Sequence, residues 1–230
     1  MWTRVKPDKA LVLMPGRGCR SIALRVLTGQ LPLEPLSDED SDLWSQALGA
    51  EGPMDKGQIA YLREGQLLAT PALQGAIDTW LATQCLTQVT RKGPATPLAC
   101  TGATFHHDAD SYADEMFCVL WLADDTPWDL YFPFINARVP LRYGTVVLFD
   151  SAQPHGVVPH GANEFDAAAL SEQTGIFLSQ DLVVGRQMRA VLNLTSHSRH
   201  GKPGFVLLNR DGCREELDPE TAAWSQQRFR

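Results

Sequence analysis

The chain has 230 residues, of which 44% are hydrophobic, so it can bury one substantial core but has little room for a second full domain. Lys and Arg number 20 against 27 Asp and Glu, which gives a formal net charge of -7 without any block of five like charges. This balance disfavours binding along the phosphate backbone of a nucleic acid, although one or two inward-facing arginines would not show in a net charge.

Targeting signals and cysteine usage point to a soluble cytoplasmic protein. The apolar run at residues 11–14 is shorter than the roughly 7–15 residues of a signal peptide, and no window reaches the roughly 18 apolar residues of a membrane span. The five cysteines are odd in number, widely spread and form no Cys-x-x-Cys pair. We therefore expect reduced, mostly buried thiols, with neither a disulfide framework nor a zinc knuckle.

Residues 1–95 are expected to form helices and strands that flank a core. The acidic, Pro-containing stretch at 31–42 is interpreted as a solvated loop or the entry to a helix. The clearest helix lies at 71–89, where Pro71 suits the first turn and Lys92-Gly93-Pro94 provides a stop. Its apolar positions recur at spacings close to 3.6 residues: Leu73, Ile77, Leu81 and Leu86.

From about residue 100 the pattern changes to short runs typical of strands, separated by turn residues. The runs are TFHHD, MFCVLWL, DLYFPFI, VPLRYGTVVLFD, HGVV, GIFLSQDLVV, MRAVLNL and GFVLLN. Eight short strands within roughly 110 residues indicate a sandwich or barrel, with bends at Gly144 and Pro154. We predict one domain over 1–230, mainly β with flanking helices (α+β), whose β core covers 100–210.

The TFHHD run carries a candidate pair of metal ligands. Residues i and i+2 of a strand point to the same side, so His106 and Asp108 should project together while Phe105 and His107 face the other way. An imidazole and a carboxylate held in this way can bind one edge of a divalent transition metal. A second imidazole from elsewhere would complete a facial triad that leaves coordination positions open.

The third ligand is predicted to be His155. It follows the apolar run and turn of GTVVLFDSAQP directly, whereas Pro159 and Gly161 place the alternative, His160, in a loop that we expect to be exposed. A lone His-x-Asp often lies on a solvent face, so the metal-site prediction rests on the motif, the strand pattern and the later histidine together.

These motifs resemble the iron(II)- and 2-oxoglutarate-dependent dioxygenases, particularly their prolyl 4-hydroxylase-like branch. The resemblance rests on His106-x-Asp108, the 47-residue step to His155, and LYFPFINARVPLRYGTVVLFDSAQPHGV, and it covers residues 100–195. It implies a double-stranded β-helix (jelly roll) core, iron(II) on the three ligands, and 2-oxoglutarate chelating the metal, with ascorbate as a supporting reductant. The implied reaction releases succinate and carbon dioxide and hydroxylates a C–H bond.

The resemblance also implies a basic side chain that meets the distal carboxylate of 2-oxoglutarate, on a strand after the second histidine. We predict Arg189, at the head of RAVLNL, with Arg186 as its competitor. An insertion at 162–175 would account for the 34 residues that separate Arg189 from His155. Tyr131 is expected to border the cosubstrate as well, with plain core packing as the alternative reading.

Two other functions remain open at this point. GTVVLFDSAQPHGVV would also suit a cupin-type metalloenzyme, but a cupin usually presents His-x-His followed by a glutamate, whereas here Asp108 takes the second position and Glu115 follows a predicted loop. The other is a barrel that binds a metal or ligand without catalysis.

The expected partner is a small-molecule or protein substrate, with neither nucleic acid nor membrane; the sequence determines neither the substrate nor the oligomeric state. Aromatic residues that could line a substrate entrance are Tyr112, Trp121, Trp128, Tyr131 and Phe132.

Overall fold

The computed structural model describes residues 11–14, 18–62, 68–124, 126–197, 207–208, 215–217 and 224–226. Its helices are α1 (Asp38–Glu51), α2 (Pro71–Thr83), α3 (Ala109–Tyr112) and α4 (Arg186–Val191). Strands before the core are β1 (Leu11–Met14), β2 (Gly18–Ser21), β3 (Leu27–Gln30), β4 (Ile59–Tyr61) and β5 (Thr90–Arg91). The core strands are β6 (Thr96–Cys100), β7 (Ala103–His106), β8 (Glu115–Trp121), β9 (Trp128–Phe132), β10 (Ala137–Pro140), β11 (Thr145–Asp150), β12 (His155–Pro159) and β13 (Gly175–Val183). Four short strands follow: β14 (Ser196–His197), β15 (Leu207–Leu208), β16 (Glu215–Leu217) and β17 (Trp224–Gln226).

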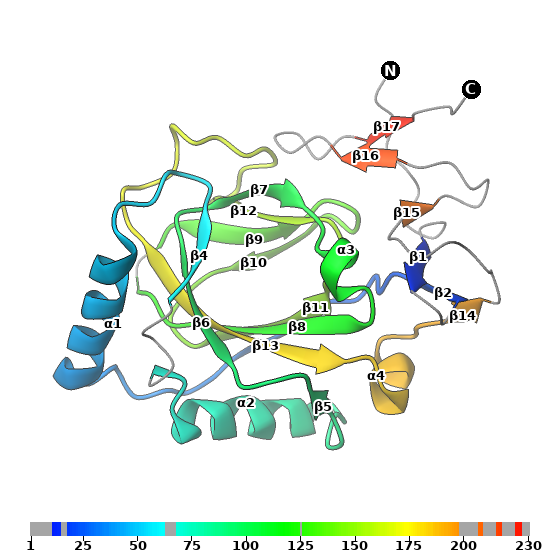
Figure 1. The fold of residues 1–230 in the computed structure, drawn as a ribbon, viewed down its shortest axis with the longest axis horizontal. Coiled ribbons are helices and arrows are strands. Elements are labelled where there is room, and N and C mark those ends of the chain that lie inside the picture. The colour runs from blue at the N-terminus through cyan, green and yellow to red at the C-terminus, as the bar shows by residue number, and fades with distance from the viewer. Residues whose placement is uncertain are drawn as a thin grey trace.

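Strands β6 to β13 form a rolled hairpin. The first of these eight pairs with the eighth, the second with the seventh, the third with the sixth and the fourth with the fifth, all antiparallel. Further pairing of β8 with β13 and of β9 with β12 joins them into two facing sheets, which surround the centre of the molecule in Figure 1. This wrapping is that of a jelly roll, so the predicted double-stranded β-helix is confirmed.

The larger sheet has the order β3-β11-β8-β13-β6-β4, with β5 beside β13, and the smaller has the order β10-β9-β12-β7. Along β8, alternate residues serve two different cores. Val119 and Trp121 pack between the two sheets, whereas Cys118 and Leu120 pack on the outer face with the helices. Because both faces of this strand are buried, its sequence after Glu115 is an unbroken apolar run.

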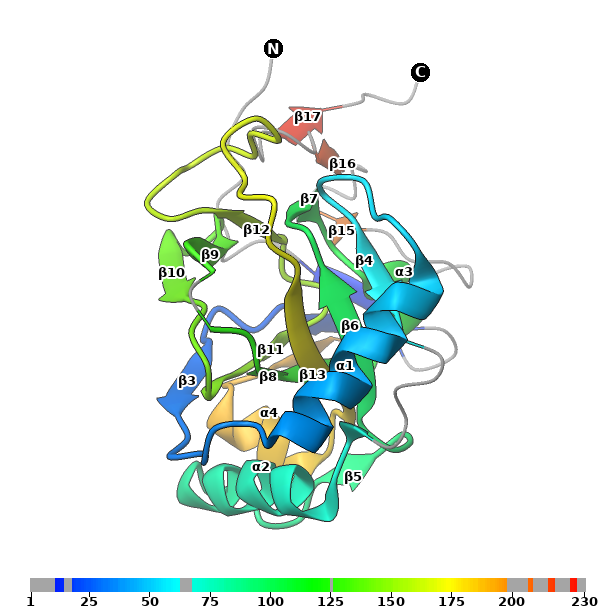
Figure 2. The ribbon, with the colours of Figure 1, turned by 90° about the vertical axis from the view of Figure 1, so that its left-hand side faces the viewer.

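Helices cover the outer face of the larger sheet. Ile77 and Leu81 of α2 and Trp44 of α1 are buried in the outer apolar cluster. Figures 1 and 2 both show α2 running along this side of the sheet, away from the space between the sheets. The helices therefore stabilise the barrel from outside and leave its interior to the strands. Among the helices that the structure describes, none combines the length and apolar character that a bilayer crossing requires.

The predicted helix at 71–89 is confirmed, but it ends earlier than expected. Thr70 caps its start by accepting a hydrogen bond from the Leu73 amide at 3.3 Å, and Pro71 occupies the first turn. The helix stops at Thr83, and Cys85 adopts a positive φ of 62°, which turns the chain away. The Lys92-Gly93-Pro94 stop is therefore not what ends it.

The strand predicted at MRAVLNL is wrong, because the structure has helix α4 there. Met188 and Leu192 are both buried against the outer face of the larger sheet, and their spacing of four suits one face of a helix. Short apolar runs of this kind fit either period, and here the helical one prevails. Most of GFVLLN lies outside the described residues; its Leu207 and Leu208 form β15, which pairs with β1.

Three cysteine side chains are placed as free thiols. Cys85, Cys100 and Cys118 are all free thiols, the first exposed and the other two buried. Burial raises the pKa of the Cys100 and Cys118 thiols to about 12, so both stay protonated and behave as small apolar groups.

A fully buried ion pair ties the N-terminal hairpin to the end of β11. The Arg20 guanidinium donates to both carboxylate oxygens of Asp150, at 2.5 and 2.8 Å, and to the Ala113 carbonyl at 3.0 Å. The same carboxylate accepts from the amides of Ala23 at 2.7 Å and Ala152 at 3.0 Å. Because every charge in this cluster has a partner, its burial is tolerated. It fixes the turn that leads toward His155.

We predict that Asp150→Ala lowers the free energy of unfolding by about 3–5 kcal/mol, because the variant leaves the Arg20 charge buried without a counterion. Urea unfolding followed by circular dichroism measures the change. Asp78→Ala is the matched control: Asp78 pairs with Arg91 at the surface, where its side chain is 46% exposed, so its loss should cost less than about 1 kcal/mol. Equal losses in the two variants would contradict the role given to the buried pair.

Candidate metal centre

Two histidines face each other at the point where β7 ends and β12 begins. His106 is the last residue of β7, His155 is the first of β12, and the two are cross-strand partners. Their ring centroids lie 4.4 Å apart. The pairing register shifts between His155 and Val157, so the ladder is irregular beside the two rings.

Asp108 reaches the same point from just beyond the strand. The expectation that it shares β7 with His106 is wrong, because β7 ends at His106 and Asp108 is the N-cap residue of α3. Its side chain makes no capping hydrogen bond and lies near both imidazoles instead. Its carboxylate Oδ2 is 3.6 Å from Nε2 of His106 and 3.4 Å from Nε2 of His155. A turn of the chain, rather than strand alternation, brings the carboxylate there.

The hydrogen bonds of the two histidines leave the correct nitrogens free for a metal. Nδ1 of His106 contacts the Thr104 carbonyl at 2.7 Å, and Nδ1 of His155 contacts the Gln153 carbonyl at 2.8 Å. A carbonyl can only accept, so each Nδ1 must donate, and in the neutral rings each Nε2 keeps its lone pair. One ligand atom from each of His106, Asp108 and His155 lies within 4.8 Å of the others. These three donors, together with the hydrogen bonds that orient the two imidazole rings, fit a divalent transition metal.

Backbone contacts hold the two sides of the centre together. The Asp108 amide donates to the Ser151 carbonyl at 2.8 Å, and the Ser151 hydroxyl donates to the Tyr112 carbonyl at 2.7 Å. Gly156, after the second histidine, lies against the β7 backbone: a Cβ there would be 3.0 Å from the Ala103 carbonyl and 2.9 Å from the Phe105 ring. A side chain at this position would push the two ligand strands apart.

Burial dominates the electrostatics of Asp108 and His155. Desolvation raises the pKa of Asp108, and the nearby His106 acts in the opposite direction. Desolvation lowers the pKa of His155 well below its ordinary value, and the proximity of His106 lowers it further. Both shifts favour the uncharged forms, so a cation placed between these groups would supply the charge that they lack.

The three ligands border a cavity of about 290 Å³ between the two sheets. Three inward-facing rungs of the larger sheet form one wall. The rung beside the metal ligands holds Phe149, Phe117 and Asp181, and the Phe149 ring lies 4.8 Å from the His155 ring. The next rung holds Val119, Ser179 and Thr96, and the third holds Trp121, Phe177 and Leu98. Leu130, Leu141 and Val157 also line the cavity.

Tyr131 does not reach this cavity. Its neighbour Leu130 lines the interior, so strand alternation turns Tyr131 to the outer face of the smaller sheet. There it packs with Phe105 and Val158, and its hydroxyl donates to Asn136 Oδ1 at 3.0 Å. The alternative of plain core packing therefore describes the position of Tyr131.

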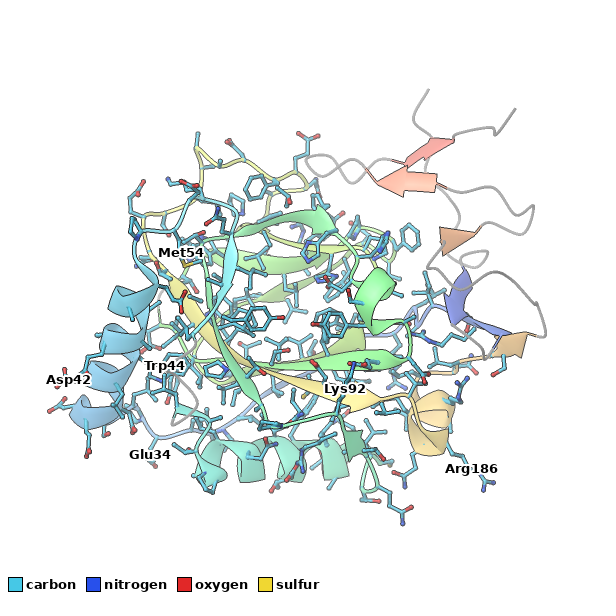
Figure 3. All side chains as sticks on the ribbon, viewed as in Figure 1. Glu34, Asp42, Trp44, Met54, Lys92 and Arg186 are labelled. Carbon is cyan, nitrogen blue, oxygen red and sulfur yellow. The ribbon has the colours of Figure 1, made fainter. Side chains whose placement is uncertain are left out.

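The two arginines considered as carboxylate anchors lie on α4, outside the barrel. Arg189 donates to the Ser196 hydroxyl at 2.9 Å, and neither it nor Arg186 is among the residues lining the cavity. Figure 3 shows Arg186 at the edge of the molecule, directed away from the barrel. The premise that Arg189 begins an inward-facing strand is wrong. The strand after His155 in the barrel is β13, whose cavity-facing residues are Phe177, Ser179 and Asp181.

Other predicted residues divide between the cavity and its surroundings. Nδ1 of His160 is hydrogen-bonded to the Asp129 carboxylate at 2.8 Å, and His160 lies outside the ligand cluster. Tyr112 and Trp121 line the cavity, whereas Trp128 and Phe132 belong to the apolar core between the sheets. The β13 residues were missed, although the alternation in GIFLSQDLV offered a signal for them. Ile59 and Tyr61 of β4, which also line the cavity, follow no clear strand signal.

No family model and no curated protein matches the chain. Among solved structures, it is similar to a prolyl hydroxylase from Trichoplax adhaerens in complex with a hypoxia-inducible factor peptide, at 14% identity over 72% of this chain and 86% of that one, with a TM-score of 0.43. A viral collagen prolyl hydroxylase from Paramecium bursaria Chlorella virus-1 matches at 13% identity over 68% and 94%, also with a TM-score of 0.43. A non-haem alpha-ketoglutarate-dependent carbocyclase from nogalamycin biosynthesis matches at 13% over 80% and 95%, again at 0.43. Because these identities and scores are low, the fold assignment rests on the chain's own strand pairing.

We predict that the metal-free protein loses stability as the pH falls below about 6.5, with a slope of up to about 1.4 kcal/mol per pH unit from His155. The pKa of His155 is lowered in the folded chain, so the unfolded chain takes up the proton first and gains from acidification. Urea unfolding of chelator-treated protein between about pH 7.5 and 5.5 measures this slope. His155→Gln should flatten it, and an identical slope in the variant would contradict the assignment.

Proposed function

We propose that this protein is a mononuclear iron(II) oxygenase whose metal is held by His106, Asp108 and His155 at the edge of the jelly-roll cavity. The observation that carries the proposal is the convergence of one ligand atom from each of the three residues within 4.8 Å. Both Nε2 atoms lie 3.4–3.6 Å from Asp108 Oδ2, and both Nδ1 atoms are committed to backbone carbonyls. Two imidazoles and one carboxylate on one face of a metal are typical of non-haem iron(II) oxygenases. A bound iron(II) would supply oxygen activation, and the chain would supply the geometry and the water-poor cavity.

The 2-oxoglutarate cosubstrate suggested by the sequence resemblance fits this chain in part. Three protein ligands leave open positions on a metal, which suits the keto and carboxylate oxygens at one end of the molecule. Its second carboxylate needs a charged partner inside the barrel, yet the described residues that line the cavity include neither Lys nor Arg. The use of 2-oxoglutarate, the benefit of ascorbate and a place in the prolyl 4-hydroxylase-like branch remain predictions.

The substrate that best suits this cavity is small and largely apolar, or is a side chain of a protein. The volume of about 290 Å³ is at the lower end of ligand pockets, which span roughly 300–1,000 Å³. Ile59 and Tyr61 on the edge strand β4 line the cavity and remain 42% and 59% exposed, so they offer an apolar lip to an incoming group. Asp181 and the absence of a cation among the described lining residues make phosphate-bearing substrates unfavourable.

The two rival functions predict different chemistry. A cupin-like centre would recruit a glutamate, but Glu115 forms an ion pair with Lys92 and lies outside the ligand cluster. A non-catalytic barrel would bind metal without consuming oxygen. Both are separated from the proposed function by asking whether oxygen uptake depends on a 2-oxo acid.

Metal binding is the first expected outcome. Purified protein should bind one iron(II) or manganese(II) per chain, and Asp108→Ala and His155→Ala should each weaken binding by more than about a hundredfold, since even the loss of an outer partner costs about 10–100-fold. Equilibrium dialysis with metal analysis gives the stoichiometry and affinity. The control is His160→Ala, whose histidine lies outside the cluster and which should bind as the wild type does. Full affinity in Asp108→Ala and His155→Ala would remove the assigned triad.

Turnover is the second expected outcome. Protein loaded with iron(II) should release labelled carbon dioxide from at least one member of a panel of C1-labelled 2-oxo acids that includes 2-oxoglutarate, with ascorbate present to keep the metal reduced. His155→Ala should abolish this release, and His160→Ala should not. Oxygen uptake that is indifferent to every 2-oxo acid would favour the cupin-like alternative, and no uptake at all would favour a binding module.

A further inference from the structure

The end of the cavity away from the metal ligands is apolar. The second carboxylate of a bound 2-oxoglutarate would need a cation there. Along β13 the three cavity-facing residues, in order of distance from the metal ligands, are Asp181, Ser179 and Phe177. Rungs of a sheet are roughly 7 Å apart, so Phe177 lies about two rungs inside the barrel. Its ring is stacked on Trp121, with centroids 5.6 Å apart and planes 10° from parallel. An aromatic stack therefore closes the interior of this wall.

Charge balance at the centre favours a ligand with one carboxylate. A divalent metal and the Asp108 carboxylate leave one positive charge, which a single chelating carboxylate neutralises. A second carboxylate would bring an uncompensated charge into a cavity whose described lining contains Asp181 but neither Lys nor Arg. Ser179 and Thr96 face each other across β13 and β6 and can donate neutral hydrogen bonds, but hydroxyl groups do not compensate a buried charge.

Lys92, a described cation beside the cavity-lining Tyr112, is engaged elsewhere. Lys92, labelled in Figure 3, forms an ion pair with Glu115, and its Nζ lies 5.5 Å from the centroid of the Tyr112 ring. Its side chain is 54% exposed, so the charge is largely solvated. Removing Lys92 from Glu115 would leave that nearly buried carboxylate unpaired. Lys92 is nevertheless the cation to test as a competing anchor.

We infer that the cosubstrate subsite of this protein selects a 2-oxo acid with an apolar tail and one carboxylate over the dicarboxylate 2-oxoglutarate. The inference rests on the proposed function for its metal, and it concerns the tail of the ligand alone. The 2-oxo acid group would bind at the metal, and the tail would lie against Val119, Leu130 and Val157 toward the stack of Trp121 on Phe177. Branched aliphatic 2-oxo acids match such a surface in both size and polarity.

Anaerobic calorimetric titration of manganese(II)-loaded protein tests the inference without any turnover. The matched pair of ligands is 2-oxopentanoate and 2-oxoglutarate, which share a five-carbon chain and differ in the second carboxylate; 4-methyl-2-oxopentanoate adds a branched tail. Both monocarboxylates should bind at least about tenfold more tightly than 2-oxoglutarate, which corresponds to about 1.4 kcal/mol. Equal or tighter binding of 2-oxoglutarate would overturn the inference.

Four variants locate the selectivity. Asp181→Asn should strengthen 2-oxoglutarate binding about three- to tenfold and leave 2-oxopentanoate unchanged, because it removes a like charge without changing shape. Ser179→Arg should make the protein prefer 2-oxoglutarate over 2-oxopentanoate, because it supplies the missing cation at a partly exposed position. Phe177→Arg would supply that cation deeper in the barrel, but it also breaks the aromatic stack with Trp121. If wild-type protein binds 2-oxoglutarate well and Lys92→Met loses that binding, Lys92 is the anchor and the inference is wrong.

Failure of the inference is distinguishable from failure of the proposed function. If one manganese(II) binds per chain through His106, Asp108 and His155 but no 2-oxo acid binds, the inference is overturned while the metal centre stands. If manganese(II) does not bind, or binds equally well to Asp108→Ala, the proposed function itself fails before any 2-oxo acid is added.

Discussion

The cross-strand pairing of His106 with His155 is the constraint on which the whole centre depends. It arises where the second and seventh strands of the rolled hairpin meet, so two residues 49 positions apart in the sequence become neighbours through the topology of the barrel. Three surrounding contacts maintain that register. The Asp150 carboxylate fixes the preceding turn through its ion pair with Arg20, and the Ser151 carbonyl accepts from the Asp108 amide. Gly156, which has no side chain, lets the β7 backbone approach closely. The strand pairing that closes the jelly roll thus also sets the geometry of the metal ligands.

Much of this arrangement was predictable from the sequence, for identifiable physical reasons. Alternation and turn residues indicated the strands of the core, and the chemistry of His-x-Asp followed by a later histidine indicated the ligands. The route by which Asp108 reaches the histidines was not predictable, because whether β7 extends two more residues or turns into α3 depends on tertiary contacts such as the Asp108 amide with Ser151. The same limit applies to residues 186–191, where a short apolar run fits either period and the surface available for packing decides between them.

The metal-binding motif does not locate the residue that would bind the second carboxylate of 2-oxoglutarate. The family resemblance implies a cation after the second histidine and so indicates Arg189, but Arg189 lies on a helix outside the barrel. The strand that does occupy the interior position presents Phe177, Ser179 and Asp181, a pattern that is readable in GIFLSQDLV once the strand is known to face the cavity on that side. Face assignment needs the register of the neighbouring strands, which one strand's sequence does not contain. The metal end of the site therefore follows from a motif, whereas its interior end depends on the register of the strands.

The most direct test of the metal centre is a crystal structure of manganese(II)-loaded protein with anomalous scattering data collected for the metal. The predicted result is a single strong anomalous peak per chain within bonding distance of Nε2 of His106, Nε2 of His155 and a carboxylate oxygen of Asp108, with both Nδ1 atoms still donating to the carbonyls of Thr104 and Gln153. A peak bound through Nδ1, or located away from these three residues, would contradict the account.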